Sequence, residues 1–296
     1  MDREKVVIIG FQDEAALARD LARRLGFPLI TVRTEQYRSG ELRLVVPRGD
    51  VRRAVVVANV AADPSSLWRL LVLARGLRER GVRRVDLVAP WLAFGRQDRL
   101  TRHDEAPAGL VLGNLLVQSF NRLITLDAHS QRFIRSFRGR LVNVLPVLNR
   151  RRLGLTGGGA RLVVAPDHGA VERARRLAAT LGCPWIALQK KRGPRGVAAR
   201  FASAAAPRRV NGAEVLLIDD MADSGQTLLV AARLLKAAGA RKIRAFVTHA
   251  FDRASLRKRL APSVVRLDAA FDHARGRLDE AERQALVAAV KKNLSR

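Results

Sequence analysis

Short runs rich in Val, Ile and Leu recur along the chain, among them VVIIG at 6–10, AVVVA at 54–58 and VLLI at 215–218. Each run is continuous, without the alternation of apolar and polar residues that marks a strand with one face in water. This pattern is typical of strands that are buried on both faces of a sheet.

Between many of these runs lie stretches whose apolar residues recur every three to four positions, at 15–26, 65–81, 169–182 and 224–240. This spacing predicts amphipathic helices, and the first three stretches end in glycine, a common residue just past a helix C-terminus. Strands that alternate with helices predict βαβ units and mostly parallel sheets. The fold class we predict is therefore α/β.

The alternation of strands and helices runs through the chain twice. Pro146 and the three glycines 157–159 interrupt it near the middle. We therefore expect two similar α/β domains, over residues 1–147 and 148–296. A last helix is expected from about Asp279 to Leu294.

The composition narrows the classes of protein to consider. With 296 residues, 48% of them hydrophobic, the chain can form a substantial core. The net charge is +28, which suits either nucleic acid or small phosphorylated substrates, but the arginines are spread along the chain and form no compact basic run. Cys183 is the only cysteine, and the start MDREKVVIIGF does not fit a signal peptide or a membrane span. We expect a cytoplasmic protein.

The apolar run at 215–218 is followed directly by Asp219 and Asp220, and then by the small polar segment ADSGQT. Ligands of parallel sheets bind at the carboxyl ends of the strands, where both carboxylates would lie. Backbone N–H groups before a helix bind phosphate, and acids beside them can hold sugar hydroxyls or hydrated Mg²⁺. A phosphorylated sugar is the ligand this predicts; the plainer alternative is a helix cap by Asp223 or Ser224.

The segment VLLIDDMADSGQT resembles the loop that binds phosphoribosyl pyrophosphate (PRPP) in type I phosphoribosyltransferases and in ribose-phosphate diphosphokinases, also called PRPP synthetases. The resemblance implies a phosphoribosyltransferase-like fold for each domain. It assigns ribose 5-phosphate to Asp219, Asp220, Asp223, Ser224, Gly225, Gln226 and Thr227.

Five further segments resemble the diphosphokinases alone, and they occur in the family's order: YRSGE, APWLAFGRQDR, LITLDAH, VVAPDHGAVERAR and LQKKRG. They imply that ATP is bound by Tyr37, Glu41, Arg96, Gln97, Asp98, Arg99 and His129. They imply metal ligation by His129 and Asp167, and catalysis by Lys190 and Arg192.

The activity that this resemblance implies is transfer of the diphosphoryl group of ATP to the 1-hydroxyl of ribose 5-phosphate, giving PRPP and AMP. Mg²⁺ is the implied cofactor. Lys190 and Arg192 would stabilise the charge that builds up on the phosphate oxygens. A homo-oligomer, a hexamer or its dimer unit, is also expected by resemblance.

The chain departs from the family's pattern at four places. Ser39 stands where an acid or amide is usual, Glu105 where an arginine is usual, and Gln226 at the second glycine of the PRPP loop. A side chain at 226 is expected to need a backbone conformation that glutamine tolerates poorly. The family's Thr-Asp-Thr-Ile-Pro segment is replaced by VVRLDAAFDHARGRLDE at 264–280.

Three other functions stay open at this point. A non-catalytic relative that regulates a true synthetase would fit Glu105, Gln226 and the replaced segment at 264–280. The intact Lys190, Arg192, His129 and acid pair argue against it. A phosphoribosyltransferase that consumes PRPP needs only one α/β domain. A nucleic-acid binder rests on charge alone, and strongly salt-dependent binding would mark it.

Overall fold

The computed structural model describes residues 6–46, 51–100, 105–155, 161–193 and 196–295. Their contacts divide the chain into two compact units, residues 1–145 with 283–296, and residues 146–282. The last helix, α9 (Glu280–Leu294), begins and ends as the sequence suggested, within one residue. Most of it belongs to the first unit, whereas the division expected from the sequence placed these residues in the second domain.

Each unit is built on a sheet that has seven strands among the described residues, and the two strand orders correspond one to one. The order is β3-β2-β1-β4-β5-β6-β7 in the first unit and β10-β9-β8-β11-β12-β13-β14 in the second. All neighbours are parallel except β2–β3, β9–β10 and β13–β14. The predicted α/β class with two similar, mostly parallel sheets is confirmed.

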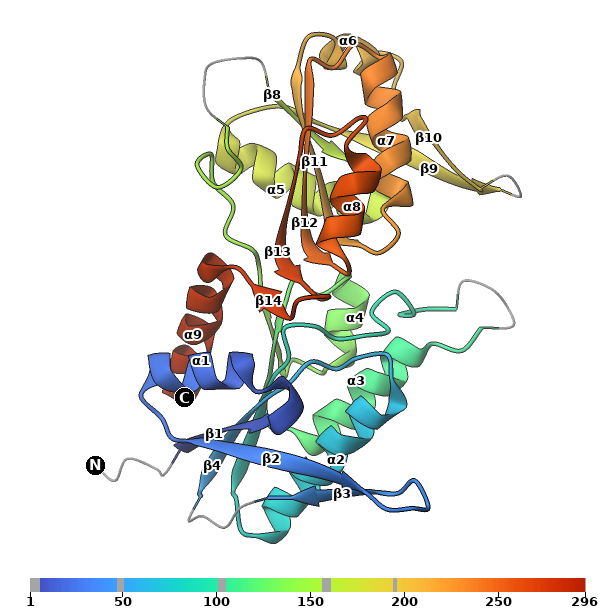
Figure 1. Cartoon of the computed structure of the whole chain (residues 1–296). Helices are drawn as coiled ribbons and strands as arrows, with labels where there is room; N and C mark the ends of the chain where they lie inside the picture. Colours follow the sequence, from blue (N-terminus) through green and yellow to red (C-terminus); the bar gives the residue numbers. More distant parts are fainter. Residues whose placement is uncertain (1–5, 47–50, 101–104, 156–160, 194–195, 296) are drawn as a thin grey trace. The chain divides into compact units, whose positions relative to one another are not determined.

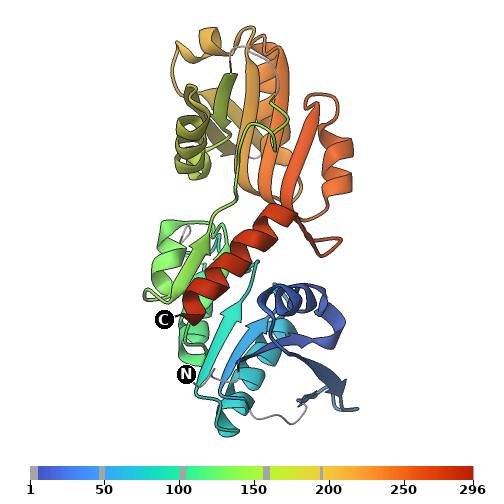
Figure 2. The ribbon, with the colours of Figure 1, turned by 90° about the vertical axis from the view of Figure 1, so that its left-hand side faces the viewer.

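In the first unit, helices lie on both faces of the sheet, with α1 and α9 on one side and α2 and α3 on the other (Figures 1 and 2). The strands are β1 (Val6–Phe11), β2 (Leu29–Gln36), β3 (Leu42–Val45), β4 (Arg53–Val57), β5 (Arg84–Val88), β6 (Leu123–Leu126) and β7 (Leu141–Val144). The helices are α1 (Ala16–Leu25), α2 (Pro64–Glu79), α3 (Ala108–Ser119) and α4 (Gln131–Ser136), besides α9.

The second unit has α5 on one side of its sheet and α7 with α8 on the other (Figure 1). Its strands are β8 (Arg161–Ala165), β9 (Trp185–Gly193), β10 (Gly196–Phe201), β11 (Glu214–Ala222), β12 (Lys242–Ala250), β13 (Arg266–Asp272) and β14 (Arg277–Leu278). Its helices are α5 (Val171–Leu181), α6 (Ala206–Val210), α7 (Gln226–Ala237) and α8 (Arg253–Leu260).

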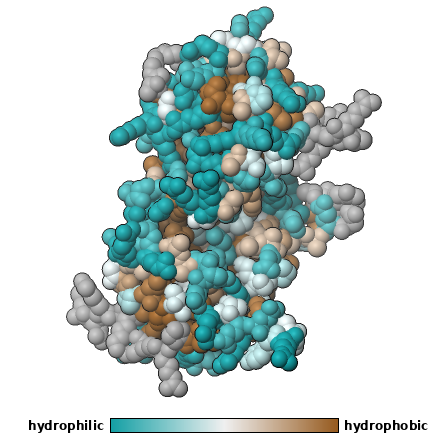
Figure 3. Space-filling view, viewed as in Figure 1, coloured by the Kyte–Doolittle hydropathy of each residue, from teal (hydrophilic) through white to brown (hydrophobic). Residues whose placement is uncertain are grey.

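Each unit has its own hydrophobic core between sheet and helices. Strands β4 and β11 show why the sequence pattern was continuous: nearly every residue of both strands is buried. The face of the molecule in Figure 3 is mainly hydrophilic, with smaller hydrophobic areas between the polar ones. No helix in the described part of the chain combines the length and apolar character needed to cross a membrane.

Candidate functional site

The second unit brings together three side chains from separate elements at the carboxyl end of its sheet. Lys190 Nζ on β9 donates a hydrogen bond of 2.7 Å to Thr227 Oγ1, on the first turn of α7. The same Nζ lies 3.3 Å from Asp167 Oδ2, just beyond β8. The structure thus joins the predicted catalytic lysine to the predicted metal ligand and to the PRPP-like loop.

The topology explains why these segments meet. Strand β8 is the first of the second sheet, and the chain continues to β9 on one side of it and to β11 on the other. The carboxyl ends of two strands that part in this way form the crevice where open α/β sheets bind ligands. Asp167 follows β8, and the acid pair lies near the end of β11.

The acid pair itself is buried. Asp219 is 9% exposed and Asp220 3%. The strand does not stop before them, as the sequence suggested, because β11 continues to Ala222. Asp219 Oδ1 accepts a hydrogen bond of 3.0 Å from the backbone N–H of Asp220.

Burial raises the pKa of Asp219 well above its ordinary value, and the negative charges of Asp220 and Asp167 raise it further. Arg173 on α5 acts in the opposite direction, and its Nη2 lies 3.8 Å from Asp220 Oδ2. Sequence reasoning did not single out Arg173. Three carboxylates thus meet two cationic side chains here, since Lys190 contacts Asp167 and Arg173 lies beside Asp220.

The loop before α7 has the form of an anion site. Gly225 is the N-cap residue, with φ of 71°, and its cap position has no side-chain hydrogen bond. The alternative weighed in the sequence, a cap by Asp223 or Ser224, is therefore not what the structure has; Ser224 Oγ accepts a long contact of 3.4 Å from the N–H of Gln226. N–H groups of the first turn that no side chain caps are the donors that bind phosphate at helix N-termini.

Gln226 fits this loop without strain, contrary to the sequence-based expectation. It is the first residue of α7, and the left-handed conformation falls on Gly225 instead. Its Oε1 accepts a hydrogen bond from Arg259 of α8. Of the other residues assigned to this loop, Asp223 is exposed. The side chain of Arg192 lies outside the described residues.

In the first unit, two segments predicted to bind ATP lie against each other. Residues 96–99 follow β5 and His129 follows β6, and these strands are parallel neighbours. A Cβ on Gly95 would lie 3.1 Å from His129 Cβ, so the backbones pack closely here. Ser130 Oγ donates to Asp98 Oδ2 at 2.5 Å and accepts from the N–H of Phe133, which caps α4.

Asp98 thus differs from its neighbours in the segment. Asp98 is buried, whereas Arg96, Gln97 and Arg99 are exposed. A buried carboxylate bonded to Ser130 can orient the segment, and exposed arginines are of the kind that bind phosphate through paired N–H groups. His129 itself is half-buried.

Both segments contain a residue in the left-handed conformation that is unusual outside glycine. Phe94 has φ of 62° and Asp127 has φ of 46°. The Asp127 N–H donates to Val144 O and that of Ala128 to Asn143 Oδ1, each at 2.8 Å. Backbone strain held in place by such bonds is frequent at functional sites.

The predicted adenine residues lie in the tight connection between β2 and β3. The N–H of Tyr37 donates to Glu41 O, and Ser39 Oγ donates to Glu41 Oε2, both at 2.9 Å. Tyr37 is 55% exposed. The departure at Ser39 is accommodated within the turn, where its hydroxyl orients the Glu41 carboxylate.

Comparison with known proteins identifies the family of the chain. The family model for the N-terminal domain of ribose phosphate pyrophosphokinase matches residues 6–119, and that for the phosphoribosyl transferase domain matches 149–276. The ribose-phosphate pyrophosphokinase of Thermococcus kodakarensis is 33% identical, over 78% of this chain and 81% of its own length. That of Marinomonas sp. is 32% identical, over 83% and 79%.

The fold agrees as well. The crystal structure of phosphoribosylpyrophosphate synthetase from Mycobacterium smegmatis superposes with a TM-score of 0.77, covering 98% of this chain and 99% of that one at 22% identity. Together with the two family models and the sequence relatives, these matches establish that the chain belongs to the ribose-phosphate pyrophosphokinase family of enzymes.

Proposed function

We propose that this chain transfers the diphosphoryl group of ATP to the 1-hydroxyl of ribose 5-phosphate, giving PRPP and AMP. The observation that carries the proposal is the position of Lys190, whose Nζ contacts both Thr227 Oγ1 and Asp167 Oδ2. A lysine between a sugar-phosphate loop and an acid site can follow the charge on a transferring phosphoryl group. It would leave its present partners for the phosphate oxygens when substrates bind.

Two features of the second unit would bind ribose 5-phosphate. The 5-phosphate would be held by the N–H groups and hydroxyls of Ser224, Gly225, Gln226 and Thr227 at the start of α7. Asp219 and Asp220 would accept hydrogen bonds from the ribose hydroxyls. Arg173, whose Nη2 lies 3.8 Å from Asp220 Oδ2, would hold the Asp220 carboxylate in place.

Mg²⁺ fits the acids of the second unit. The described residues contain no group of three or more His, Cys, Asp or Glu side chains arranged to hold a metal. Mg²⁺ ordinarily takes one or two carboxylates, and water and phosphate oxygens fill its other positions. Asp167, Asp219 and Asp220 would form such a partial site. The negative charges of Asp220 and Asp167 raise the pKa of Asp219, and a bound cation would relieve the repulsion between these carboxylates. Bound there, Mg²⁺ would neutralise phosphate charge.

ATP would be bound by the first unit. Arg96 and Arg99 are placed to contact the triphosphate, and His129 to contact the phosphates and their metal. Asp98 would act through Ser130 and α4 as a positioning residue. Tyr37 and Glu41 would contact adenine, and Arg192 would assist Lys190.

A non-catalytic regulatory role is the second candidate. Glu105 and the altered 264–280 segment favoured it in the sequence, whereas Gln226 no longer does, because it occupies an ordinary helical position. Assembly into a homo-oligomer stays a prediction, which light scattering of the purified protein would test.

The test is ³¹P NMR of the purified protein with ATP, Mg²⁺ and ribose 5-phosphate. We expect AMP and a sugar-bound diphosphate to appear together, at a rate at least 100-fold lower in Lys190→Ala. Lys236→Ala is the matched control, since Lys236 is an exposed lysine of the same unit whose Nζ donates to a backbone oxygen, that of Pro262. No turnover in the wild type, with ribose 5-phosphate still bound, would favour the regulatory role.

A further inference from the structure

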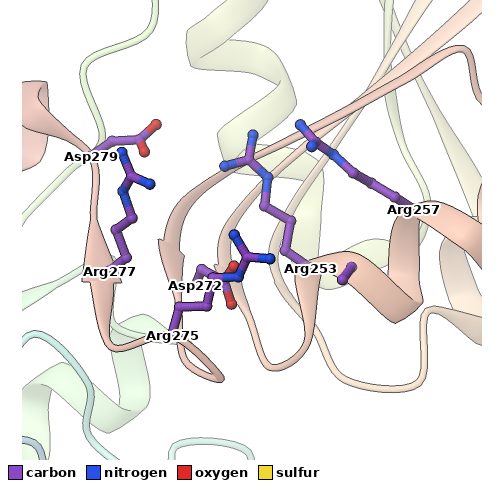
Figure 4. Close-up of a pocket in the computed structure, with 7 residues that line it drawn as sticks. Arg253, Arg257, Asp272, Arg275, Arg277 and Asp279 are labelled. Carbon is purple, nitrogen blue, oxygen red and sulfur yellow. The ribbon is translucent and has the colours of Figure 1, made fainter.

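A cluster of charged side chains lies around a pocket of the second unit, among residues to which neither the sequence nor the proposed reaction gives a role. The pocket, of about 270 Å³, lies between the first turns of α8, the end of β13 and the turn that leads through β14. Figure 4 shows side chains from these elements converging on it. The lining residues are Arg253, Ala254, Arg257, Asp272, Arg275, Arg277 and Asp279.

The charge of the pocket defines the class of ligand. Four arginines stand against two aspartates, which leaves two positive charges (4 − 2 = 2). Guanidinium groups bind phosphate through paired N–H donors, and a phosphate monoester carries close to two negative charges at neutral pH. The volume is small for a ligand pocket, which favours a compact ligand over a large nucleotide.

Two buried polar atoms on residues that line this pocket have no hydrogen-bond partner among the described residues. One is Asp272 Oδ1, on a residue that is only 8% exposed. The other is Nε of Arg253, whose Nη2 pairs with Asp268 at 3.3 Å. Buried polar atoms are normally paired, so an acceptor and a donor left unpaired on two lining residues indicate that a ligand completes them.

Asp272 indicates a second chemical group on the ligand besides a phosphate. A carboxylate would repel a bare phosphate, but its free oxygen can accept a hydrogen bond from a hydroxyl. We propose that the pocket binds a small phosphate monoester that also carries a hydroxyl group, with the phosphate on Arg275 and Arg277 and the hydroxyl on Asp272 Oδ1. This site is separate from the residues proposed to bind substrate, and it does not depend on the proposed activity.

The test measures binding of two probes to the full chain by calorimetry, at fixed salt: glycerol 3-phosphate, which has hydroxyls, and methyl phosphate, which has none. All proteins carry Thr227→Ala and Lys190→Ala, which weaken phosphate binding at the start of α7. In this background we expect glycerol 3-phosphate to bind about 10-fold more tightly than methyl phosphate. Asp272→Ala should abolish that preference, and equal affinities for both probes before the change would overturn the role of Asp272.

Arginine variants separate a built site from a generally basic surface. We expect Arg275→Gln with Arg277→Gln to weaken glycerol 3-phosphate binding at least 10-fold. The control pair, Arg208→Gln with Arg209→Gln on α6, removes the same charge from exposed positions of the same unit and should leave binding within twofold. If both pairs weaken binding equally, or neither does, the proposed site is wrong. The four arginines changed in these two pairs are exposed, so none of the substitutions disturbs the core.

Discussion

Arg259 Nη2 donates a hydrogen bond of 2.5 Å to Gln226 Oε1 and so ties α8 to the first residue of α7. The same helix supplies Leu256, whose Cδ2 would lie 2.7 Å from a Cβ on Gly225. Helix α8 therefore supports the loop before α7 at two successive positions. A glycine is required at one of these positions, and the other accepts a long polar side chain.

The first prediction contrasts these two positions. Gly225→Ala places a side chain in the left-handed conformation and against Leu256, so we expect a loss of at least about 1 kcal/mol in unfolding free energy and at least 10-fold weaker ribose 5-phosphate binding. Gln226→Ala should keep the unfolding free energy within about 0.5 kcal/mol of the wild type and ribose 5-phosphate binding within about threefold, because alanine is favourable in a helix. Urea denaturation and calorimetry measure the two quantities, and a severe defect in Gln226→Ala would contradict this account.

The second prediction concerns the electrostatic cost of burying Asp219 beside Asp220. Because the folded protein raises the pKa of Asp219 above that of the unfolded chain, ionisation above that unfolded value opposes folding. Asp219→Asn should therefore raise the unfolding free energy at pH 7 without ligands, by about 1 kcal/mol, while abolishing turnover.

Asp223→Asn is the control for this effect, since Asp223 lies in the same loop but is exposed. Its unfolding free energy should stay within about 0.5 kcal/mol of the wild type. A less stable Asp219→Asn protein would show that this carboxylate stabilises the fold.

The third prediction concerns the loss of folding stability at acidic pH. Burial lowers the pKa of His273 to about 3, with a further contribution from His249, whose Nδ1 lies 3.2 Å from His273 Nε2. Between the ordinary value of 6.5 and about 3, the unfolded chain holds a proton that the folded chain lacks. Stability is thus lost as pH falls through this window, by up to about 1.4 kcal/mol per pH unit for one proton.

His273→Phe should reduce that slope while keeping the ring stacked on Phe251, since the two centroids are 4.6 Å apart. Urea denaturation between pH 4 and pH 7 measures it. His168→Asn, at an exposed histidine, serves as the comparison and should keep the wild-type slope. Identical slopes for all three proteins would remove His273 as the source of acid sensitivity.

The fourth prediction concerns a buried polar cluster in the first unit. Arg53 Nη2 pairs with Asp86 Oδ2 at 3.0 Å and donates to Asn293 O at 2.8 Å, while Asn293 Nδ2 donates to the same carboxylate oxygen at 3.0 Å. Asn293→Ala removes one donor to a buried charge, and should lower the unfolding free energy by about 1–3 kcal/mol.

Asn114→Ala is the matched change for this cluster, at an exposed position whose contact with Arg138 is 3.5 Å. It should have an effect below about 0.5 kcal/mol. Equal effects of the two substitutions would indicate that the cluster contributes little.

The runs that the sequence analysis singled out include the central strands β1, β4 and β11, where burial on both faces makes the run continuous. Strands β2, β7, β10, β13 and β14 were not among the predicted strands, and GVAARF of β10 and the two residues of β14 carry no such run. Helix α3 was also missed: AGLVLGNLLVQS is apolar on most sides, so its sequence has little helical periodicity.

The candidate site also has residues that the sequence identified and contacts that it did not. Local motifs sufficed for Asp219, Asp220 and the loop that follows, since neighbours in sequence stay neighbours in the fold. The bonds of Lys190 to Thr227 and of Ser130 to Asp98 span 37 and 32 residues, and no local pattern encodes them. Arg173 lacks a signal for a different reason, because it is one arginine among many on an ordinary helix.

Because Arg53 bonds residues near the end of α9, the first unit can complete its contacts only late in synthesis on the ribosome. The ribosome completes the strands of the first unit long before it adds Asn293 and Leu294, whose carbonyl oxygens both accept from Arg53. During that interval the Arg53–Asp86 pair can form only with water in place of α9. The nascent first unit should therefore reach its full resistance to protease only after the end of α9 has left the exit tunnel.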